Sequence, residues 1–171
     1  MIMKKPEPLF NPLPKKIITA YDLSGKKHQR NLKNFQFRLS VYGVLSQGNK
    51  ILVQRYPGLK TYGLPGGAVE MEETISEALV REFKEETGLT VEQGRLLTVI
   101  EDFFTHEGMD AHGVLVFYEV IRKRGKIIKE GSQIDSSDVG FVSLFKLKKT
   151  SVQRVFWQVV KKLKEVVTPQ V

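Results

Sequence analysis

Three glutamates at helical spacing could do chemistry together. Glu82, Glu85 and Glu86 follow one another at positions i, i+3 and i+4. Carboxylates at that spacing stand close together on a helix, where like charges repel each other. A cation between them would reverse the sign of this interaction, and hard divalent cations take carboxylate oxygens together with the phosphates of a substrate. The spacing therefore predicts a site for Mg²⁺, with Mn²⁺ as an alternative, that acts on a phosphate compound.

The helix that must carry these glutamates has an apolar stripe that turns acidic. At a rotation of about 100° per residue from Ile75, Ala78 and Leu79 fall within about 60° of the starting direction, and Glu82 and Glu86 within about 20°. A solvated acidic helix end is the alternative interpretation, because glutamate is a good helix former. The placement of the acids on the core-facing stripe favours the metal site.

Both ends of this helix are marked in the sequence. Thr74 and Glu77 have the spacing of a capping box, and Gly88 stands where a left-handed C-terminal residue belongs. The preceding Pro-Gly-Gly at 65–67 can bend sharply and bring a backbone carbonyl close to an ion. Within the helix, Arg81 is available to pair with neighbouring acids and hold their geometry.

Residues 67–89 resemble the Nudix box, Gly-x5-Glu-x7-Arg-Glu-U-x-Glu-Glu-x-Gly-U, in which U is a bulky apolar residue. Nine specified positions over twenty-three residues make a far more specific signal than a lone glycine-rich motif. The fixed positions are filled by Gly67, Glu73, Arg81, Glu82, Phe83, Glu85, Glu86, Gly88 and Leu89.

The resemblance implies a fold, an activity and a set of site residues. The implied fold is an α/β/α sandwich with a mixed sheet, and the implied activity is that of a MutT-like hydrolase in which water attacks a phosphorus of a nucleoside diphosphate linked to another group. Metal ligands would be Glu82, Glu85, Glu86 and the carbonyl of Gly66, with Arg81 also in the catalytic set. Glu85 is our choice for the general base.

Several residues outside the box are further candidates, each with a plainer alternative. Arg38 and Arg55 lie on predicted strands and could bind phosphates, or could simply face solvent. Four acids are alternatives for the base, although such residues are also common in turns. Histidines could line the site and aromatic residues could stack on a base, but a loop position for the histidines and core or rim packing for the aromatic residues are the favoured explanations. These candidates are Glu101, Asp102, Asp135 and Asp138, then His106 and His112, then Tyr62, Phe104 and Tyr118.

Composition bounds the class of protein. The chain has 171 residues, 41% hydrophobic and 27% charged, and is predicted to form a single domain over 1–171 with a basic, proline-rich segment at about 1–16. It has no cysteine, which excludes disulfides and thiolate ligands. No apolar run approaches the length needed to cross a bilayer, so we expect a cytoplasmic protein without membrane partners.

The net charge of +8 is concentrated near the two ends. Residues 1–34 hold eight Lys and Arg against two acids, 146–171 hold seven against one, and 35–145 hold twelve against sixteen. A basic surround could draw anionic substrates toward an acidic metal centre. Solvated terminal lysines are an equally good explanation.

Periodicity predicts the elements around the acidic helix. Strands are expected at 35–42, at 51–56 as the hairpin partner of the first, at 96–104, 113–121, 127–128 and 139–144, and a hairpin arm at 17–27. Ser151 is expected to begin a last helix with one apolar face. Helices flanking the strands give an α/β layered domain.

Competing functions differ in what they need from the acids. A nucleotide-sensing or RNA-binding module would use the basic ends but has no physical need for three repelling glutamates, so hydrolysis is favoured. A nucleoside triphosphate is the first candidate substrate, and an RNA 5′ end is a further one.

Two departures from the family pattern bear on the substrate. Glu72 replaces a common glycine, and no proline stands between Pro65 and Pro169, which argues against an ADP-sugar. Neither the substrate nor the oligomeric state is indicated by the sequence.

Overall fold

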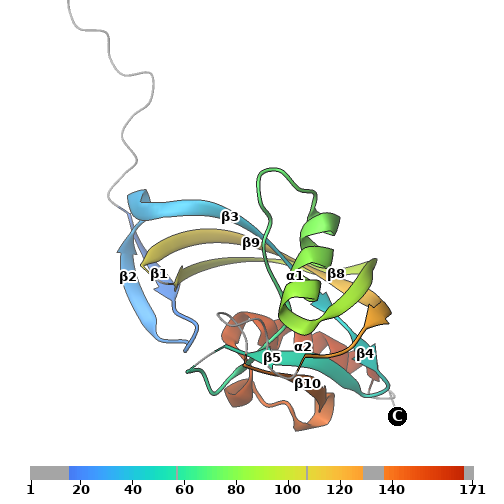
Figure 1. Cartoon of the computed structure of the whole chain (residues 1–171). Helices are drawn as coiled ribbons and strands as arrows, with labels where there is room; N and C mark the ends of the chain where they lie inside the picture. The colour runs from blue at the N-terminus through green and yellow to red at the C-terminus, as the bar shows by residue number, and fades with distance from the viewer. Residues whose placement is uncertain (1–15, 57, 107, 129–136, 168–171) are drawn as a thin grey trace, which may run out of the picture.

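The computed structural model describes residues 16–56, 58–106, 108–128 and 137–167. Within these ranges the chain forms two sheets and two α-helices (Figure 1). The larger sheet has the order β2-β1-β8-β9-β3-β7, and the smaller has the order β10-β5-β4, with β6 paired to β5. The larger sheet contains β1 (Ile17–Tyr21), β2 (Lys27–Asn31), β3 (Phe35–Val44), β7 (Gly66–Ala68), β8 (Leu89–His106) and β9 (Met109–Gly125); the smaller contains β4 (Ser46–Gln47), β5 (Lys50–Arg55), β6 (Tyr62–Gly63) and β10 (Ser137–Ser143).

The larger sheet is mixed. β3 runs parallel to β9 over ten residue pairs, from Phe35↔Asp110 to Val44↔Glu119. β1 is parallel to β8 through the single pair Tyr21↔Phe104, whereas β8–β9, β3–β7 and β1–β2 are antiparallel. The mixed sheet agrees with the predicted fold class.

The two helices cover opposite faces of the strands. Leu52 packs in the cluster beneath α1 (Ile75–Thr87), whereas its neighbours Ile51 and Val53 pack in the cluster beneath α2 (Arg154–Val167). Successive residues of a strand point to opposite faces, so β5 lies between the two helices. This is an α/β/α sandwich.

Helix α1 begins and ends where the sequence predicts. Thr74 Oγ1 accepts a hydrogen bond from the Glu77 N–H at 3.3 Å, and the Glu77 carboxylate accepts one from the Thr74 N–H at 2.8 Å, which completes the capping box. Gly88 closes the helix with φ 75°. The close packing of α1 on β3 depends on Gly43 of β3, where an added Cβ would lie 2.3 Å from the Phe83 ring.

The predicted partner of the first long strand is wrong in part. The strand at 50–55 pairs with its chain neighbours Ser46–Gln47 and Tyr62–Gly63, whereas β3 pairs with β7 and β9. The chain crosses from one sheet to the other at Leu45, whose carbonyl accepts a hydrogen bond from the Leu52 N–H at 2.9 Å. The return strand therefore extends the smaller sheet, where β10 is its main neighbour.

Three other boundaries differ from the predictions. No strand forms at 127–128, where the Ile128 N–H donates to the carbonyl of Thr87 at the end of α1. The last helix begins at Arg154, after a 3₁₀ turn at Lys149–Ser151 and a bridge between Val152 and Tyr62. β8 and β9 are longer than expected, with register shifts between Thr90 and Thr98 that disturb the alternating pattern.

The hairpin arm is confirmed as β1 and β2, which lie side by side in Figure 1. The proposed N-terminal segment at about 1–16 falls almost wholly outside the described residues. Among the described helices, none is long and apolar enough to cross a membrane. The single-domain organisation remains a prediction.

Candidate active site

A cleft of about 980 Å³ opens beside the acidic end of α1. Its walls come from the β1–β2 hairpin, β3, β7, α1 and the turn that joins β8 to β9. Helix α1 contributes Glu82 and Glu86, and β3 contributes Arg38. With Gly66 of β7, the cleft therefore brings three of the four predicted metal ligands and one of the predicted phosphate-binding arginines to one surface.

Arg81 is the hub of the hydrogen bonds around these acids. Its Nε and Nη2 donate to the two carboxylate oxygens of Glu73 at 3.0 and 2.6 Å, and Nη2 also donates to the Ala68 carbonyl at 3.1 Å. Its Nη1 donates to Glu82 at 2.9 Å and to Glu85 at 3.3 Å. The guanidinium thus ties the loop before α1 to the acids of its last turns, and its hydrogen bonds lower the pKa of the Glu73 carboxyl.

Glu82 and Glu86 are held in a partly dehydrated setting. Glu86 is only 7% exposed, and its carboxylate accepts a hydrogen bond from the Gly66 N–H at 2.7 Å. Burial raises the pKa of the Glu82 carboxyl above its ordinary value, although the hydrogen bond from Arg81 opposes that rise. A buried carboxylate with a raised pKa is a group that a bound cation would stabilise in its charged form.

Two glycines allow the strand β7 to lie against these acids. Gly66 has φ 136°, and an added Cβ would lie 2.1 Å from the carbonyl oxygen of Val41. At Gly67 an added Cβ would lie 2.6 Å from the Glu82 carboxylate. A side chain at Gly66 would collide with the backbone of β3, and one at Gly67 would displace the Glu82 carboxylate.

The donor set fits a hard divalent cation, although the acids are not gathered into a metal-binding group. Within the described residues, no three His, Cys, Asp or Glu side chains are grouped closely enough to hold an ion. Glu82 and Glu86 line the cleft, whereas Glu85 contacts Arg81 and is 55% exposed. An exposed side chain can change rotamer at small cost, so the oxygen ligands are available on one helix end.

The other predicted site residues are divided between the cleft and places remote from it. Arg55 does not line the cleft: it donates to the Tyr62 hydroxyl at 2.7 Å, lies over the Tyr62 ring and pairs with Asp138 at 3.6 Å. Its placement gives no support to phosphate binding. His106 and Phe104 line the cleft.

The alternative bases are engaged elsewhere. Glu101 and Asp102 lie within β8 rather than in a loop, where Glu101 pairs with His112 and Asp102 with Arg154. Asp135 falls outside the described residues. Tyr118 packs against the cluster beneath α1.

Sequence reasoning missed several residues that line the cleft or adjoin it. The hairpin arm contributes Asp22, His28 and Arg30, and two tyrosines, Tyr42 and Tyr56, stand at the cleft wall. Burial raises the pKa of Tyr42 to about 12. The alternation of His28 and Arg30 on one short strand was the available signal, but it did not show that the strand faces the site.

Comparison with known proteins identifies the family. Residues 36–163 match the family model of the NUDIX domain. The chain belongs to the NUDIX family. The resemblance carried by the box is therefore confirmed.

Two relatives bear different activities in their names. An ADP-ribose pyrophosphatase from Methanocaldococcus jannaschii is 40% identical over 95 residues, which cover 48% of this chain and 56% of that protein. The 8-oxo-dGTP diphosphatase of Escherichia coli is 30% identical over 99 residues, which cover 56% of this chain and 72% of that protein. The match thus spans little more than half the length of the archaeal relative.

Solved NUDIX structures share the fold. A MutT NUDIX hydrolase from Burkholderia pseudomallei superposes with a TM-score of 0.59 at 20% identity, covering 74% of this chain and 97% of that one. This likeness confirms the predicted α/β/α sandwich. The β1–β2 arm precedes residue 36 and so lies outside the matched NUDIX region.

Proposed function

We propose that this chain is a hydrolase, dependent on Mg²⁺ or Mn²⁺, that cleaves a phosphorus anhydride bond in a nucleoside diphosphate-linked compound. A nucleoside triphosphate, cleaved with release of pyrophosphate, is the first candidate substrate. The observation that carries the proposal is the Arg81 hub, which holds Glu73, Glu82 and Glu85 together at the edge of the cleft. A protein that only bound nucleotides would gain nothing from concentrating these carboxylates.

The proposed roles follow from where each side chain lies. Glu82, Glu85 and Glu86, with the Gly66 carbonyl, would hold the cation, which supplies charge stabilisation at the phosphoryl oxygens and lowers the pKa of an attacking water. Glu85, the most exposed of the three, would accept the proton from that water. Arg38, across the cleft on β3, would bind a phosphate oxygen.

A nucleoside diphosphate sugar is the second candidate substrate. The observation in its favour is the 40% identity to a protein named ADP-ribose pyrophosphatase, which exceeds the 30% identity to the 8-oxo-dGTP diphosphatase. The absence of a proline after the box weakens this candidate.

The test is hydrolysis of a substrate panel by the wild type and by Glu85→Gln and Glu86→Gln. The panel holds nucleoside triphosphates, 8-oxo-dGTP, ADP-ribose and a 5′-triphosphorylated RNA, each with Mg²⁺, with Mn²⁺ and with chelator. Because each substitution removes a charge from the proposed metal site, we expect turnover to fall by about 10²- to 10⁴-fold. Glu92→Gln is the matched control, since Glu92 is exposed on β8 and pairs with Lys123 outside the cleft.

Full turnover by the Glu86→Gln protein would contradict the site assignment. If no compound were hydrolysed and RNA bound tightly with a strong dependence on salt, the protein would be a binding module instead.

A further inference from the structure

The β1–β2 arm brings two basic side chains to the cleft that have no role in the proposed function. His28 and Arg30 alternate on β2, so both lie on the same face of that strand, about 7 Å apart along it. Both line the cleft. The match to the NUDIX domain begins at residue 36, so these side chains are additions to the family region.

A largely buried carboxylate fixes the position of Arg30. The Arg30 Nε donates to Asp110 Oδ1 at 3.1 Å, and the Asp110 side chain is only 10% exposed, whereas that of Arg30 is 38% exposed. A guanidinium carries four further N–H donors on its two Nη atoms, in the geometry that binds two oxygens of a phosphate. Because its side chain is already ordered by Asp110, Arg30 loses little conformational freedom when it binds an anion.

Asp22 orients His28 in a similar way. Asp22 Oδ2 accepts a hydrogen bond from His28 Nε2 at 2.8 Å, and Oδ1 accepts bonds from the N–H and hydroxyl of Ser24 and from the N–H of Lys26. Burial alone would raise the pKa of the Asp22 carboxyl, but these hydrogen bonds outweigh it and hold that pKa below its ordinary value. An ionised carboxylate can only accept, so Nε2 carries the proton of this pair, and Nδ1 is the second ring nitrogen that can bind a ligand.

Arg30 and the predicted metal ligands mark opposite ends of the cleft. Asp110, the partner of Arg30, is paired with Phe35 at the start of β3, whereas Gly66 is paired with Tyr42 near the end of that strand. The seven residues of β3 between these two levels span about 23 Å at the rise of a strand. A triphosphate, with only two bridging oxygens, is far shorter than this. An anion bound by Arg30 must therefore belong to a different part of the ligand from the phosphates at the metal end.

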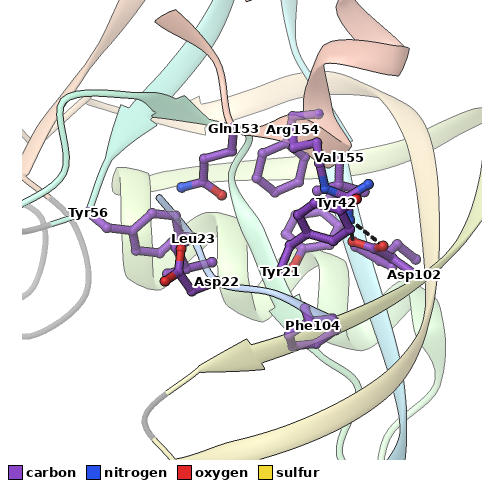
Figure 2. Close-up of a pocket in the computed structure, with 12 residues that line it drawn as sticks. Tyr21, Asp22, Leu23, Tyr42, Tyr56, Asp102, Phe104, Gln153, Arg154 and Val155 are labelled. Atoms are coloured by element: carbon purple, nitrogen blue, oxygen red, sulfur yellow. Dashed lines mark hydrogen bonds and ion pairs between the residues drawn. The ribbon is translucent and has the colours of Figure 1, made fainter. Parts of the chain in front are cut away.

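The tip of the arm is held against the rest of the fold. A smaller cavity of about 70 Å³ adjoins the cleft between this tip and the start of α2, and its walls include Leu23 and Gln153 (Figure 2). The Arg154 guanidinium, which is paired with Asp102, lies 3.9 Å from the centre of the Tyr21 ring at the end of β1. The basic side chains of β2 are therefore held in place along the cleft.

We propose that His28 and Arg30 form a second anion site, the arm site, which binds a phosphate group of the ligand remote from the anhydride at the metal end. The cleft volume of about 980 Å³ lies at the upper end of the range for ligand pockets, so it has room for an elongated compound. A nucleoside diphosphate-linked compound with a further phosphate, separated from the anhydride by a spacer longer than one sugar ring, fills both ends. A simple nucleoside triphosphate leaves the arm site to solvent. This inference rests on the proposed function for the anhydride, whereas the arm site itself does not depend on catalysis.

The test is the binding of inorganic phosphate to the whole chain in the presence of a chelator, followed by NMR of the histidine rings. Without a metal ion the carboxylates of α1 repel an anion, so phosphate binding reports on the basic part of the cleft. The chain has three histidines, which keeps this spectrum simple. We expect the ring signals of His28 to shift with a single dissociation constant. Those of His112 should stay unchanged, because His112 pairs with Glu101 and stacks on Phe103 outside the cleft.

A variant of unchanged net charge isolates the contribution of Arg30. Arg30→Gln combined with Asp110→Asn replaces the ion pair by two amides, which can still bond to each other and hold the arm. We expect the dissociation constant for phosphate to rise about tenfold, because a charged donor pair to the anion is lost. Arg95→Gln combined with Glu119→Gln is the matched control. It replaces an exposed ion pair outside the cleft and should leave phosphate binding as in the wild type.

His28→Gln covers the case in which the double variant does not fold. The glutamine amide can still donate to Asp22, but the second ring nitrogen is lost, so phosphate binding should weaken about threefold or more. The melting temperature should change little, because the bond to Asp22 is kept.

Three outcomes would overturn the inference. They are unshifted His28 signals, shifts of His112 as large as those of His28, and an unchanged dissociation constant in both the folded double variant and His28→Gln. Hydrolysis of a panel compound without phosphate binding in chelator would leave the proposed function standing and remove the arm site. Phosphate binding at the arm without hydrolysis of any panel compound would do the reverse.

Discussion

Glu82 is a partly buried carboxylate that lines the cleft. Burial raises the pKa of its carboxyl above the ordinary value of 4.5, against the hydrogen bond from Arg81. A cation bound by the same carboxylate favours the charged form, so added Mg²⁺ should lower that pKa. We expect an NMR titration of the Glu82 side-chain carbonyl carbon to move to lower pH as Mg²⁺ is added. The exposed Glu92 is the reference, and an equal shift at both residues would indicate ionic strength rather than binding.

The strand β7 is the element that brings backbone to the acids of α1, and Gly66 is its critical point. Gly66→Ala would place a Cβ against the Val41 carbonyl in a backbone conformation, φ 136°, that other residues rarely adopt. We expect a loss of at least about 2 kcal/mol in the free energy of unfolding, measured by urea denaturation. Activity should fall as well, because the Gly66 N–H positions Glu86.

Gly140→Ala is the control for this change. Gly140 lies on β10 with nothing within 4 Å of the added Cβ, so its substitution should cost far less. Similar losses for the two variants would mean that the tight contact at Gly66 relaxes easily.

At the scale of elements, the sequence predicts what depends on neighbours along the chain. The capping box at Thr74, the left-handed Gly88 and the acidic stripe of α1 were all available from local spacing. The pairing of β5 with β10 could not be predicted, because strand partners depend on contacts between distant segments. The chain also crosses from one sheet to the other at Leu45, so β5 does not return along β3. The prediction that Arg55 lies near the site failed for a similar reason, since the alternation of residues along a strand does not show which face of the strand meets the cleft.

The candidate site was likewise predictable only where it is local. The box residues lie within one loop and one helix, so their grouping follows from the helix geometry. Gln153 and Leu23 are separated by most of the chain, and only the folded structure brings both to one pocket. No pattern in either segment signals that contact.

At the scale of the whole molecule, the β1–β2 arm is attached to the rest of the fold by few contacts. β1 joins the larger sheet through the single pair Tyr21↔Phe104, supplemented by the Arg30–Asp110 ion pair at 3.1 Å and by the stacking of Arg154 on Tyr21. Segments held by few contacts open more readily than the core. The position of the arm thus depends in part on the contacts of Arg154 with Asp102 and Tyr21.

Replacing Arg154 with methionine should loosen the arm without unfolding the domain. We expect hydrogen–deuterium exchange to accelerate about tenfold or more in 17–31, because the Tyr21 contact is lost, while β3 and β9 keep their protection. Arg95→Met is the matched control, since Arg95 pairs with Glu119 on the surface, away from the arm. Uniform acceleration across all strands would mean that the Arg154–Asp102 pair supports the whole fold. Acceleration confined to the arm would mean that the Arg154 contacts hold the arm specifically.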